Sequence, residues 1–424
     1  MSHCAIVGIN WGDEGKGRMV DYLSDHYGAV IRYQGGNNAG HTVVNGYGKF
    51  ALNLLPCGIF NPGTMNVLGT GMVVNPEHLC HEMAMVREKG VSISPENLRI
   101  SDRAVMVLPI HPAQDQWEEE RLGSKSFGST RRGISPAYGD RAMKKALRMG
   151  DLLYPDNLEE ELRRLIDWKN QVFAPGYGQK PLSYEDTLAW IHTWGDQLKD
   201  YITDAGSLLQ SLERDGRSFL FEAQLGALRD LDYGIYPYTS SSSPLSCAAP
   251  VGCGYPAVKI DRVVGTVKAY STCVGEGPFV GELEGDMAHR LREAGAEYGA
   301  ATGRPRRVGW LDMVATRYGV ELQAATELAV TKLDVLSGFD ELPVCVAYEM
   351  DGETIDRFPY TPSLYRCMPV YRVFPGWKKD ISSARKIGDL PREAREYVDF
   401  MEKSLSCPIT FVSVGAERHQ LIRL

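Results

Sequence analysis

The chain has 424 residues, of which 43% are hydrophobic and 24% charged, and its formal net charge is −8. This composition is typical of a globular protein, and the excess of negative charge disfavours broad binding to nucleic acids or anionic membranes. Nine scattered cysteines without CxxC or zinc-type spacing predict reduced thiols and a cytoplasmic protein. Because the sequence has neither a signal-peptide pattern nor an apolar run of the ~18 residues that span a bilayer, we expect no membrane segment.

The first distinctive segment is GINWGDEGKG, residues 8–17. It follows the apolar run 5–7 and precedes a helical pattern over residues 18–25. A strand, a glycine-rich loop and a helix in this order aim backbone N–H groups and a helix N-terminus at phosphate. The residues suited to hold the anion are three glycines and one lysine: Gly12, Gly15, Gly17 and Lys16.

This segment resembles a Walker A motif, G-x-x-x-x-G-K-[ST], with two departures. Asn10 replaces the first glycine, and Gly17 replaces the hydroxyl residue that would contact magnesium. If the site uses Mg²⁺, its ligands must come from elsewhere, and the nearest candidate is Asp13, as a metal ligand or as a proton acceptor. The alternative interpretation, an ordinary strand-to-helix turn, is disfavoured by the density of glycines.

The next segments continue the alternation of strands and helices. Residues 29–33 are predicted as a strand, and alternating hydrophobic residues over 50–54 predict a half-buried one. Residues 67–69 begin another strand, and residues 76–89 are predicted as a helix with Pro76 in its first turn. The strand at 29–33 ends in a second glycine-rich loop, QGGNNAGHT, residues 34–42, with the polar side chains Gln34, Asn37, Asn38, His41 and Thr42.

The middle of the chain is predicted to be mostly helical. Amphipathic patterns indicate helices over residues 112–122, 157–172 and 184–204, so we interpret residues 100–215 as a helical excursion from the sheet. The segment 127–145 is predicted as a loop because it is rich in glycine and cations. It is either a solvated basic face or a clamp for phosphate or carboxylate; its cations are Arg131, Arg132, Arg141, Lys144 and Lys145.

The last third returns to strands, predicted at residues 219–222, 263–269, 328–331 and 408–412. Between the second and third lies ATGRPRRVGW, residues 301–310, in which three arginines fall within four positions. Arginine grips carboxylate or phosphate with two parallel hydrogen bonds. This segment is therefore a candidate anion site.

The strand at 328–331 ends in Thr331-Lys332-Leu333-Asp334, which resembles the [NT]KxD motif of GTPases. A carboxylate at the fourth position accepts two hydrogen bonds from the ring N–H and amine of guanine, whereas adenine presents the reverse pattern. Ser413 to Ala416 would form a second base-contacting loop.

The pattern as a whole predicts an α/β fold with a large, mostly parallel central sheet, helices on both faces, a P-loop-like GTP site and an inserted helical subdomain, residues 100–215, within one domain, residues 1–424. In such sheets ligands collect at the carboxyl ends of the strands. The loops that begin near residues 10, 34, 223, 331 and 413 should therefore face one crevice.

Several motifs together resemble the adenylosuccinate synthetase family. They occur in order and span nearly the whole chain: NWGDEGKG, YQGGNNAGHT, RRGISPAYGDRA, DYGIYPY, VGEGPF, TGRPRRVGW, TKLDVLSGFDELPVCVAY and PVYRVFPGW…SVGAER. The resemblance implies a GTP- and Mg²⁺-dependent C–N ligase of purine biosynthesis that joins L-aspartate to IMP. It also implies a homodimer in which a basic residue reaches the neighbour's nucleotide phosphate.

The resemblance further implies a role for each matched residue. Asp13 would take the ring proton of the base while GTP phosphorylates its 6-oxygen, and His41 would act as an acid as GDP leaves. Lys16 and backbone donors would stabilise the transferring phosphoryl group, and Asp13 with the Gly40 carbonyl would hold Mg²⁺. GTP would be bound by Gly12, Glu14, Gly15, Lys16, Gly17, Gly40, Thr42, Arg306, Lys332, Asp334, Ser413 and Gly415. IMP would be bound by Asn38, Thr130, Lys144, Gln224, Ser240 and Arg304, and aspartate by Ala301, Thr302, Gly303 and Arg304.

The sequence departs from the family pattern around the acceptor nucleotide. Leu225 stands at the family's glutamine position, with Gln224 one residue earlier. Ser240 replaces a threonine, Lys144 an arginine that would cross the dimer, and Cys273 an arginine. Two alternatives therefore stay open: a paralogue that ligates aspartate or a related amine to another purine nucleotide, and a non-catalytic GTP-binding regulator. The presence of Asp13, Lys16 and His41 disfavours the second.

Overall fold

The computed structural model describes residues 2–299, 303 and 305–424. Ala301, Thr302 and Arg304, which the sequence assigns to aspartate or IMP binding, lie outside the described residues. Within the described part of the chain, every helix is too short or too polar to cross a bilayer.

A ten-stranded sheet forms the centre of the molecule, and all of its strand pairs are parallel except β18 with β19. From one edge to the other the strands are β19 (Leu421–Arg423), β18 (Ile409–Ser413), β14 (Glu327–Thr331), β11 (Arg262–Lys268), β1 (Cys4–Gly8), β10 (Phe219–Glu222), β2 (Ala29–Arg32), β5 (Met65–Leu68), β7 (Leu98–Ser101) and β9 (Ile202–Thr203).

Four smaller sheets surround it. They are the hairpin β3 (His41–Asn45) with β4 (Gly48–Leu52), β6 (Val73–Val74) with β8 (Val105–Met106), β12 (Ser271–Cys273) with β13 (Arg307–Gly309), and β15 (Glu341–Met350) between β16 (Glu353–Ile355) and β17 (Met368–Pro375).

The helices pack on both faces of the central sheet. Alternate residues of β1 belong to different hydrophobic clusters: Cys4 and Ile6 pack with α1, and Ala5 and Val7 with α7. The helices are α1 (Lys16–Ser24), α2 (Pro76–Glu88), α3 (Ile110–Leu122), α4 (Ile134–Ala142), α5 (Pro155–Gly176), α6 (Tyr184–Trp194), α7 (Ala205–Arg214), α8 (Ala249–Cys253), α9 (Gly285–Gly295), α10 (Met313–Gln323), α11 (Thr361–Leu364) and α12 (Arg392–Leu405).

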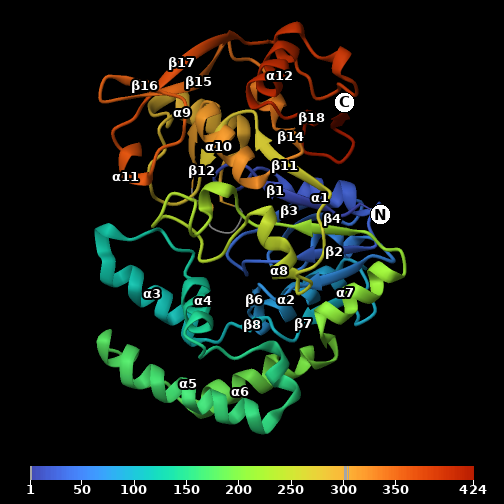
Figure 1. Cartoon of the computed structure of the whole chain (residues 1–424), viewed down its shortest axis with the longest axis vertical. Coiled ribbons are helices and arrows are strands. Elements are labelled where there is room, and N and C mark those ends of the chain that lie inside the picture. The colour runs from blue at the N-terminus through green and yellow to red at the C-terminus, as the bar shows by residue number, and fades with distance from the viewer. Residues whose placement is uncertain (1, 300–302, 304) are drawn as a thin grey trace.

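The two ends of the molecule differ in architecture (Figure 1). Helices α3 to α6 form one end, below the sheet in this view, whereas β15 to β17 and α12 form the other. The carboxyl ends of β1, β2, β10, β14 and β18 belong to one parallel sheet, so the predicted loops leave it on the same side.

The structure corrects three local predictions. The segment 127–145 is not all loop, because α4 occupies Ile134–Ala142. The helix predicted over 184–204 ends at Trp194, and β9 then joins the central sheet. Helix α1 begins two residues earlier than predicted, at Lys16, because Gly15 adopts a positive φ of 95° and starts the helix there.

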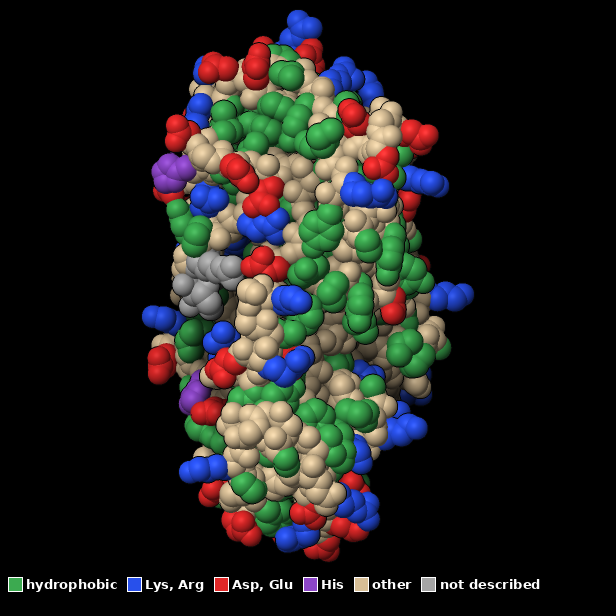
Figure 2. Space-filling model, turned by 90° about the vertical axis from the view of Figure 1, so that its left-hand side faces the viewer, with side chains coloured by type: hydrophobic (Ala, Val, Ile, Leu, Met, Phe, Trp, Pro, Cys, Tyr) green, Lys and Arg blue, Asp and Glu red, His purple; other side chains and the backbone are tan. Residues whose placement is uncertain are grey.

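The face of the molecule in Figure 2 carries charges of both signs. On the face in Figure 2, hydrophobic side chains gather near the top and the middle, with acidic and basic side chains between and around them. All nine cysteines are free thiols.

Candidate active site

The carboxylate of Glu14 fills the centre of the glycine-rich loop after β1. It accepts hydrogen bonds from the backbone N–H groups of Asn10, at 3.1 Å, and Gly12, at 2.8 Å, and it pairs with Lys16 Nζ at 2.6 Å. Both charged side chains are 2% exposed. The donors that suit a phosphate group therefore serve Glu14 in this structure, which places Glu14 inside the loop as a competitor for the phosphate position.

Gly17 is required by the approach of the second glycine-rich loop. A Cβ at this position would lie 2.8 Å from Cβ of His41 and 3.1 Å from the carbonyl oxygen of Thr42. This contact explains why the loop lacks the Walker hydroxyl, and it confirms that the two loops lie together. His41 and Thr42 are the first residues of β3 rather than loop residues as predicted.

His41 is held by a buried carboxylate that the sequence did not single out. Glu222, the last residue of β10, lies 2.5 Å from His41 Nδ1 and also accepts from the Cys57 thiol, at 3.0 Å, and from the Cys57 N–H, at 2.8 Å. Burial opposes ionisation of Glu222, but the His41 contact, the Arg32 charge and the Cys57 thiol outweigh it and lower its pKa to about 2.

The ionised Glu222 fixes the tautomer of His41. A carboxylate only accepts, so Nδ1 must carry the proton. Burial lowers the pKa of His41 despite the neighbouring carboxylate, which leaves a neutral ring whose Nε2 is buried and without a partner among the described residues. Nε2 is therefore the ring nitrogen that can contact a ligand or exchange a proton.

His41 Nδ1, Cys57 Sγ and a Glu222 oxygen lie within 4.8 Å of one another, the only such group of three potential metal ligands in the described part of the chain. Their mutual hydrogen bonds account for this proximity. A nitrogen, sulfur and oxygen set suits a transition metal rather than Mg²⁺. Asp13 and the Gly40 carbonyl offer the hard oxygen atoms that Mg²⁺ prefers.

Asp13 lies at the tip of the loop with a positive φ of 60°. Its carboxylate is 28% exposed and lies 3.0 Å from Arg306 Nε, close enough for an ion pair although the N–H is not aligned as a hydrogen bond. The same guanidinium contacts Glu297 through Nη1, at 2.7 Å. Asp13 and Arg306 are therefore neighbours in this structure.

The TKLD segment lies directly against the glycine-rich loop. Thr331 donates to the backbone oxygen of Glu14 at 2.6 Å, and Lys332 pairs with Glu297 at 2.7 Å. Asp334 keeps one buried carboxylate oxygen without a partner among the described residues. Burial raises the pKa of Asp334, against the pull of Lys332 and Arg18. An open, partly buried carboxylate is the feature that guanine recognition needs.

Arg18, which the sequence did not single out, fastens the second base-contacting loop. From α1 it donates to the Ser413 hydroxyl, to the Gly415 carbonyl at 2.5 Å and to the Glu417 carbonyl at 2.6 Å. Ser413 and Gly415 are thereby brought to the loop that carries Lys16, as predicted.

Gln224 is held by contacts within the protein. It is fully buried, and its amide donates to the carbonyls of Gly36, at 2.8 Å, and Asn53, at 3.2 Å, with its oxygen left unpartnered. Leu225 occupies the neighbouring position at a positive φ of 60°, and a Cβ on Gly12 would lie 3.4 Å from its Cα. Asn38 caps its own loop by accepting from the Gly36 N–H at 3.2 Å.

Two of the other predicted acceptor residues, Thr130 and Lys144, flank α4. Tyr138 of α4 accepts from the Gly35 N–H at 2.9 Å and so ties α4 to the second glycine-rich loop. Thr130 before the helix and Lys144 after it are exposed. The Ser240 N–H donates to the backbone carbonyl of Arg229 at 2.9 Å. The Gly303 N–H donates to the backbone carbonyl of Gly299 at 2.8 Å.

Arg229 supplies a guanidinium beside Cys273. Its Nη2 lies 3.1 Å from the Cys273 sulfur and donates to the Val274 carbonyl, and Nη1 donates to the Tyr238 carbonyl. Cys273 is fully buried, and the Arg229 guanidinium reaches it from a segment 44 positions earlier in the chain.

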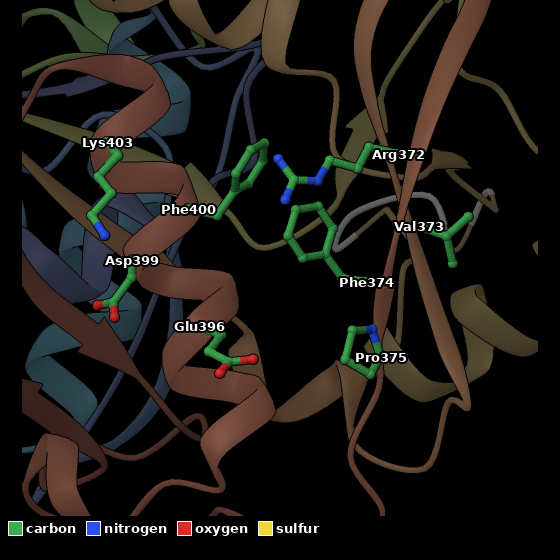
Figure 3. A pocket seen from close by; sticks show the side chains of 8 residues that line it. All are labelled: Arg372, Val373, Phe374, Pro375, Glu396, Asp399, Phe400 and Lys403. Atoms are coloured by element: carbon green, nitrogen blue, oxygen red, sulfur yellow. The ribbon is translucent and has the colours of Figure 1, made fainter.

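A hollow of about 490 Å³ lies elsewhere, between β17 and α12 (Figure 3). The Arg372 guanidinium lies 4.8 Å from the ring centre of Phe374 and 5.2 Å from that of Phe400, so cation–π contacts join the strand to the helix. None of the predicted site residues that the structure describes lines this hollow.

Comparisons with known proteins place the chain among adenylosuccinate synthetases. The family model for adenylosuccinate synthetase matches residues 5–422. Adenylosuccinate synthetase 2 of Pseudoalteromonas translucida is 47% identical over 424 residues, covering 100% of both chains. The adenylosuccinate synthetase of Caldanaerobacter subterraneus subsp. tengcongensis is 41% identical over 425 residues, covering 100% of this chain and 99% of that one. The structure of the fully ligated adenylosuccinate synthetase from Plasmodium falciparum aligns with a TM-score of 0.94 at 35% identity and covers 100% of both chains.

Proposed function

The chain belongs to the adenylosuccinate synthetase family, and from this premise we propose how its own residues carry out the reaction. It is a GTP-dependent C–N ligase that joins L-aspartate to IMP and releases GDP and phosphate. The observation that carries our assignment of roles is the close packing of Gly17 against His41, because it supports a phosphate loop and an imidazole acting on one phosphoryl group.

In the first step, Asp13 accepts the proton from the ring nitrogen of the IMP base. The 6-oxygen then forms a bond to the γ-phosphorus of GTP, and the bond between that phosphorus and the bridging oxygen breaks, so that GDP leaves. A hypoxanthine N–H is a weak acid, so a carboxylate placed beside it lowers the barrier. Lys16 and the loop N–H groups stabilise the charge on the transferring group once Glu14 yields them.

His41 contributes through Nε2. The neutral ring in this structure presents a lone pair there, so His41 must gain a proton before it can act as the acid that assists departure of GDP. An incoming triphosphate supplies negative charge that raises the proton affinity of the ring, and Glu222 stabilises the resulting imidazolium. Glu222 therefore supports both protonation states of His41.

Mg²⁺ fits the oxygen atoms of Asp13 and Gly40. When bound there it would neutralise charge on the GTP phosphates. Arg306 competes with Mg²⁺ for the same carboxylate. We therefore propose that Asp13 releases Arg306 and binds Mg²⁺ and the IMP base when the substrates bind.

In the second step, the amine of aspartate attacks carbon 6 of the phosphorylated base, the bond between carbon 6 and the phosphoryl oxygen breaks, and phosphate leaves with the proton that the amine gives up. We propose that residues 301–304 hold the aspartate carboxylates, through Thr302, Gly303 and Arg304 after Ala301. Guanine is read by Asp334, with Lys332, Ser413 and Gly415 around it, while Thr42 and Arg306 contact the phosphates or ribose.

The acceptor end carries a second proposal. The Gln224 amide is committed to two backbone carbonyls, so Leu225 makes an apolar surface where a glutamine would bind the base. This observation favours acceptance of another purine monophosphate besides IMP. Asn38, Thr130, Lys144 and Ser240 would contact the nucleotide.

We also propose a cytoplasmic homodimer in which Lys144 reaches the partner's nucleotide, with residues 100–215 as an inserted helical subdomain of one domain. Lys144 is exposed and follows α4, which suits a contact across subunits. Sedimentation with and without nucleotide tests the dimer.

The decisive experiment measures phosphate release from GTP with IMP and aspartate together and with each omitted. Release that requires both supports the proposed roles, and mass spectrometry should find adenylosuccinate. A screen of purine monophosphates with aspartate present decides the acceptor. Release that proceeds without any acceptor would contradict the assignment of Asp13 as the base for the nucleotide.

A further inference from the structure

Glu297 is a fully buried carboxylate that neither the motifs nor the mechanism above uses. It follows α9 and lies just before the ATGRPRR segment. One of its oxygens contacts Lys268 Nζ at 2.8 Å, Lys332 Nζ at 2.7 Å and the Tyr270 hydroxyl at 2.5 Å. The other oxygen contacts Arg306 Nη1 at 2.7 Å. A single carboxylate therefore holds three cations.

The three cations differ in their access to the site. The side chain of Lys268 is 3% exposed and enclosed, whereas those of Arg306 and Lys332 are 15% and 33% exposed. Burial opposes ionisation of Glu297, but the three cations hold its pKa well below its usual value, and burial lowers the pKa of Lys268 to about 8. Buried ion clusters of this kind contribute little net stability, so a role in placing the two exposed cations accounts for the cluster better than a role in holding the fold.

Glu297 connects two segments that are far apart in the sequence. The Arg306 N–H donates to the backbone carbonyl of Glu297 at 2.9 Å, and Tyr298 forms a β-bridge with Pro305, so residues 298 and 305 lie side by side next to Glu297. Lys332 precedes Asp334 and adopts a positive φ of 57°, and it also donates to the Gly295 carbonyl at 2.6 Å. Arg306 also forms an ion pair with Asp13.

We propose that Glu297 is a positioning residue whose one carboxylate fixes Lys332 at the guanine end of the site and Arg306 at the Asp13 end in a single arrangement. This inference rests on the proposed function, which places both cations at GTP. Without the charge of Glu297, Lys332 loses its anchor beside Asp334. Arg306 keeps Asp13 as its carboxylate partner, and the base is then held in an ion pair. Nucleotide affinity and turnover should therefore fall together.

The test is Glu297→Gln, which keeps the shape of the side chain and removes its charge. We expect the KM for GTP to rise about tenfold and kcat to fall about tenfold, since each misplaced contact of this kind is worth about a factor of ten. Asp312→Asn is the matched control, because Asp312 is a fully buried carboxylate at the start of α10 that caps the Ala315 N–H at 2.9 Å. It should leave both constants within about twofold.

A merely structural role would lower the amount of folded protein and leave KM and kcat per folded molecule unchanged, and that result would overturn the proposal. If Glu297→Gln does not fold, Glu297→Asp keeps the charge on a shorter side chain that cannot reach both cations. It should raise the KM for GTP about threefold or more, and wild-type constants in that variant would also overturn the proposal.

The proposed function fails separately, in the wild-type protein. If wild type shows no phosphate release that depends on IMP and aspartate, the assigned reaction is wrong. If wild type ligates aspartate and Glu297→Gln behaves as wild type, only the role of Glu297 is wrong.

Discussion

Two buried carboxylates organise opposite parts of the molecule, and their surroundings differ. Asp140 of α4 accepts from Lys169 Nζ at 2.7 Å and from His111 Nε2 at 3.0 Å, and all three side chains are at most 1% exposed. His111 Nδ1 accepts from the Leu108 N–H, so the ring is neutral and donates through Nε2. One positive charge balances one negative charge in this insert cluster.

The site cluster consists of Glu297, Asp13, Lys268, Lys332 and Arg306, with three positive charges against two negative charges. Three buried polar atoms of the site have no hydrogen-bond partner among the described residues: Asp334 Oδ1, His41 Nε2 and Arg306 Nε, which forms only the ion pair with Asp13. A closed, balanced cluster holds helices together, whereas an open cluster with an excess of cations suits an anionic ligand. The following changes test this difference.

The largest effect on chemistry should come from Asp13→Asn in the site cluster. We expect turnover to fall by about a thousandfold or more, because the change removes the base. GTP binding should stay within a few fold, since the loop remains. Steady-state phosphate release and GTP titration measure the two effects. Asp351→Asn, an exposed carboxylate on the β15–β16 turn, is the control; near-normal turnover in Asp13→Asn would reject its role.

The largest effect on stability should come from Lys169→Met in the insert cluster. The change leaves Asp140 buried without its cation, so the free energy of unfolding should fall by about 3–5 kcal/mol. Adding Asp140→Asn should recover part of this loss, because no unpaired charge remains. Lys199→Met breaks an exposed pair with Asp196 and should cost at most ~1 kcal/mol. Urea unfolding of wild type, the two single lysine variants and the double variant measures these differences. Equal losses of unfolding free energy in Lys169→Met and Lys199→Met would contradict the proposed difference between a buried and an exposed ion pair.

Acid should weaken the protein through the carboxylate that holds His41. The pKa of Glu222 is about 2 in the folded protein, below its ordinary value of 4.5. Its contribution is therefore complete above pH 4.5 and is lost as the pH falls from about 4.5 to about 2, roughly 3 kcal/mol in all. The difference in unfolding free energy between wild type and Glu222→Gln should shrink over this range, and a constant difference would contradict the shift.

The smallest effect should be a change of nucleotide preference in Asp334→Asn. The carboxylate offers two accepting oxygens to the two N–H donors of guanine, whereas an amide offers one accepting oxygen and a donating NH2 group. Selectivity for GTP over ATP should therefore fall about 10- to 100-fold. Asp340→Asn, on the exposed turn before β15, is the control. If the ratio of kcat/KM for GTP and ATP is unchanged, the TKLD segment does not read the base.

The alternation of apolar runs, glycine-rich loops and amphipathic helices was enough to predict the parallel sheet, the order of its main strands along the chain and the loops at their carboxyl ends. These features are local, because hydrophobic period and glycine content act within a few residues. Gly12, Lys16 and Asp334 could be named for the same reason, since each lies in a short motif. The helix α4 was missed because its glycine and cations resemble a loop, and packing of Ile134 and Ala137 against β6 and β8 decided otherwise.

Only the tertiary structure could identify the residues that hold the motif residues in place. Glu222 lies 181 positions from His41, Arg18 lies 395 positions from Ser413, and Lys332 lies 35 positions from Glu297. No local pattern marks such partners, because a buried charge finds its counterpart wherever the fold brings one close. The contact between Arg229 and Cys273 has the same cause, since 44 positions separate the two residues and only packing brings them together.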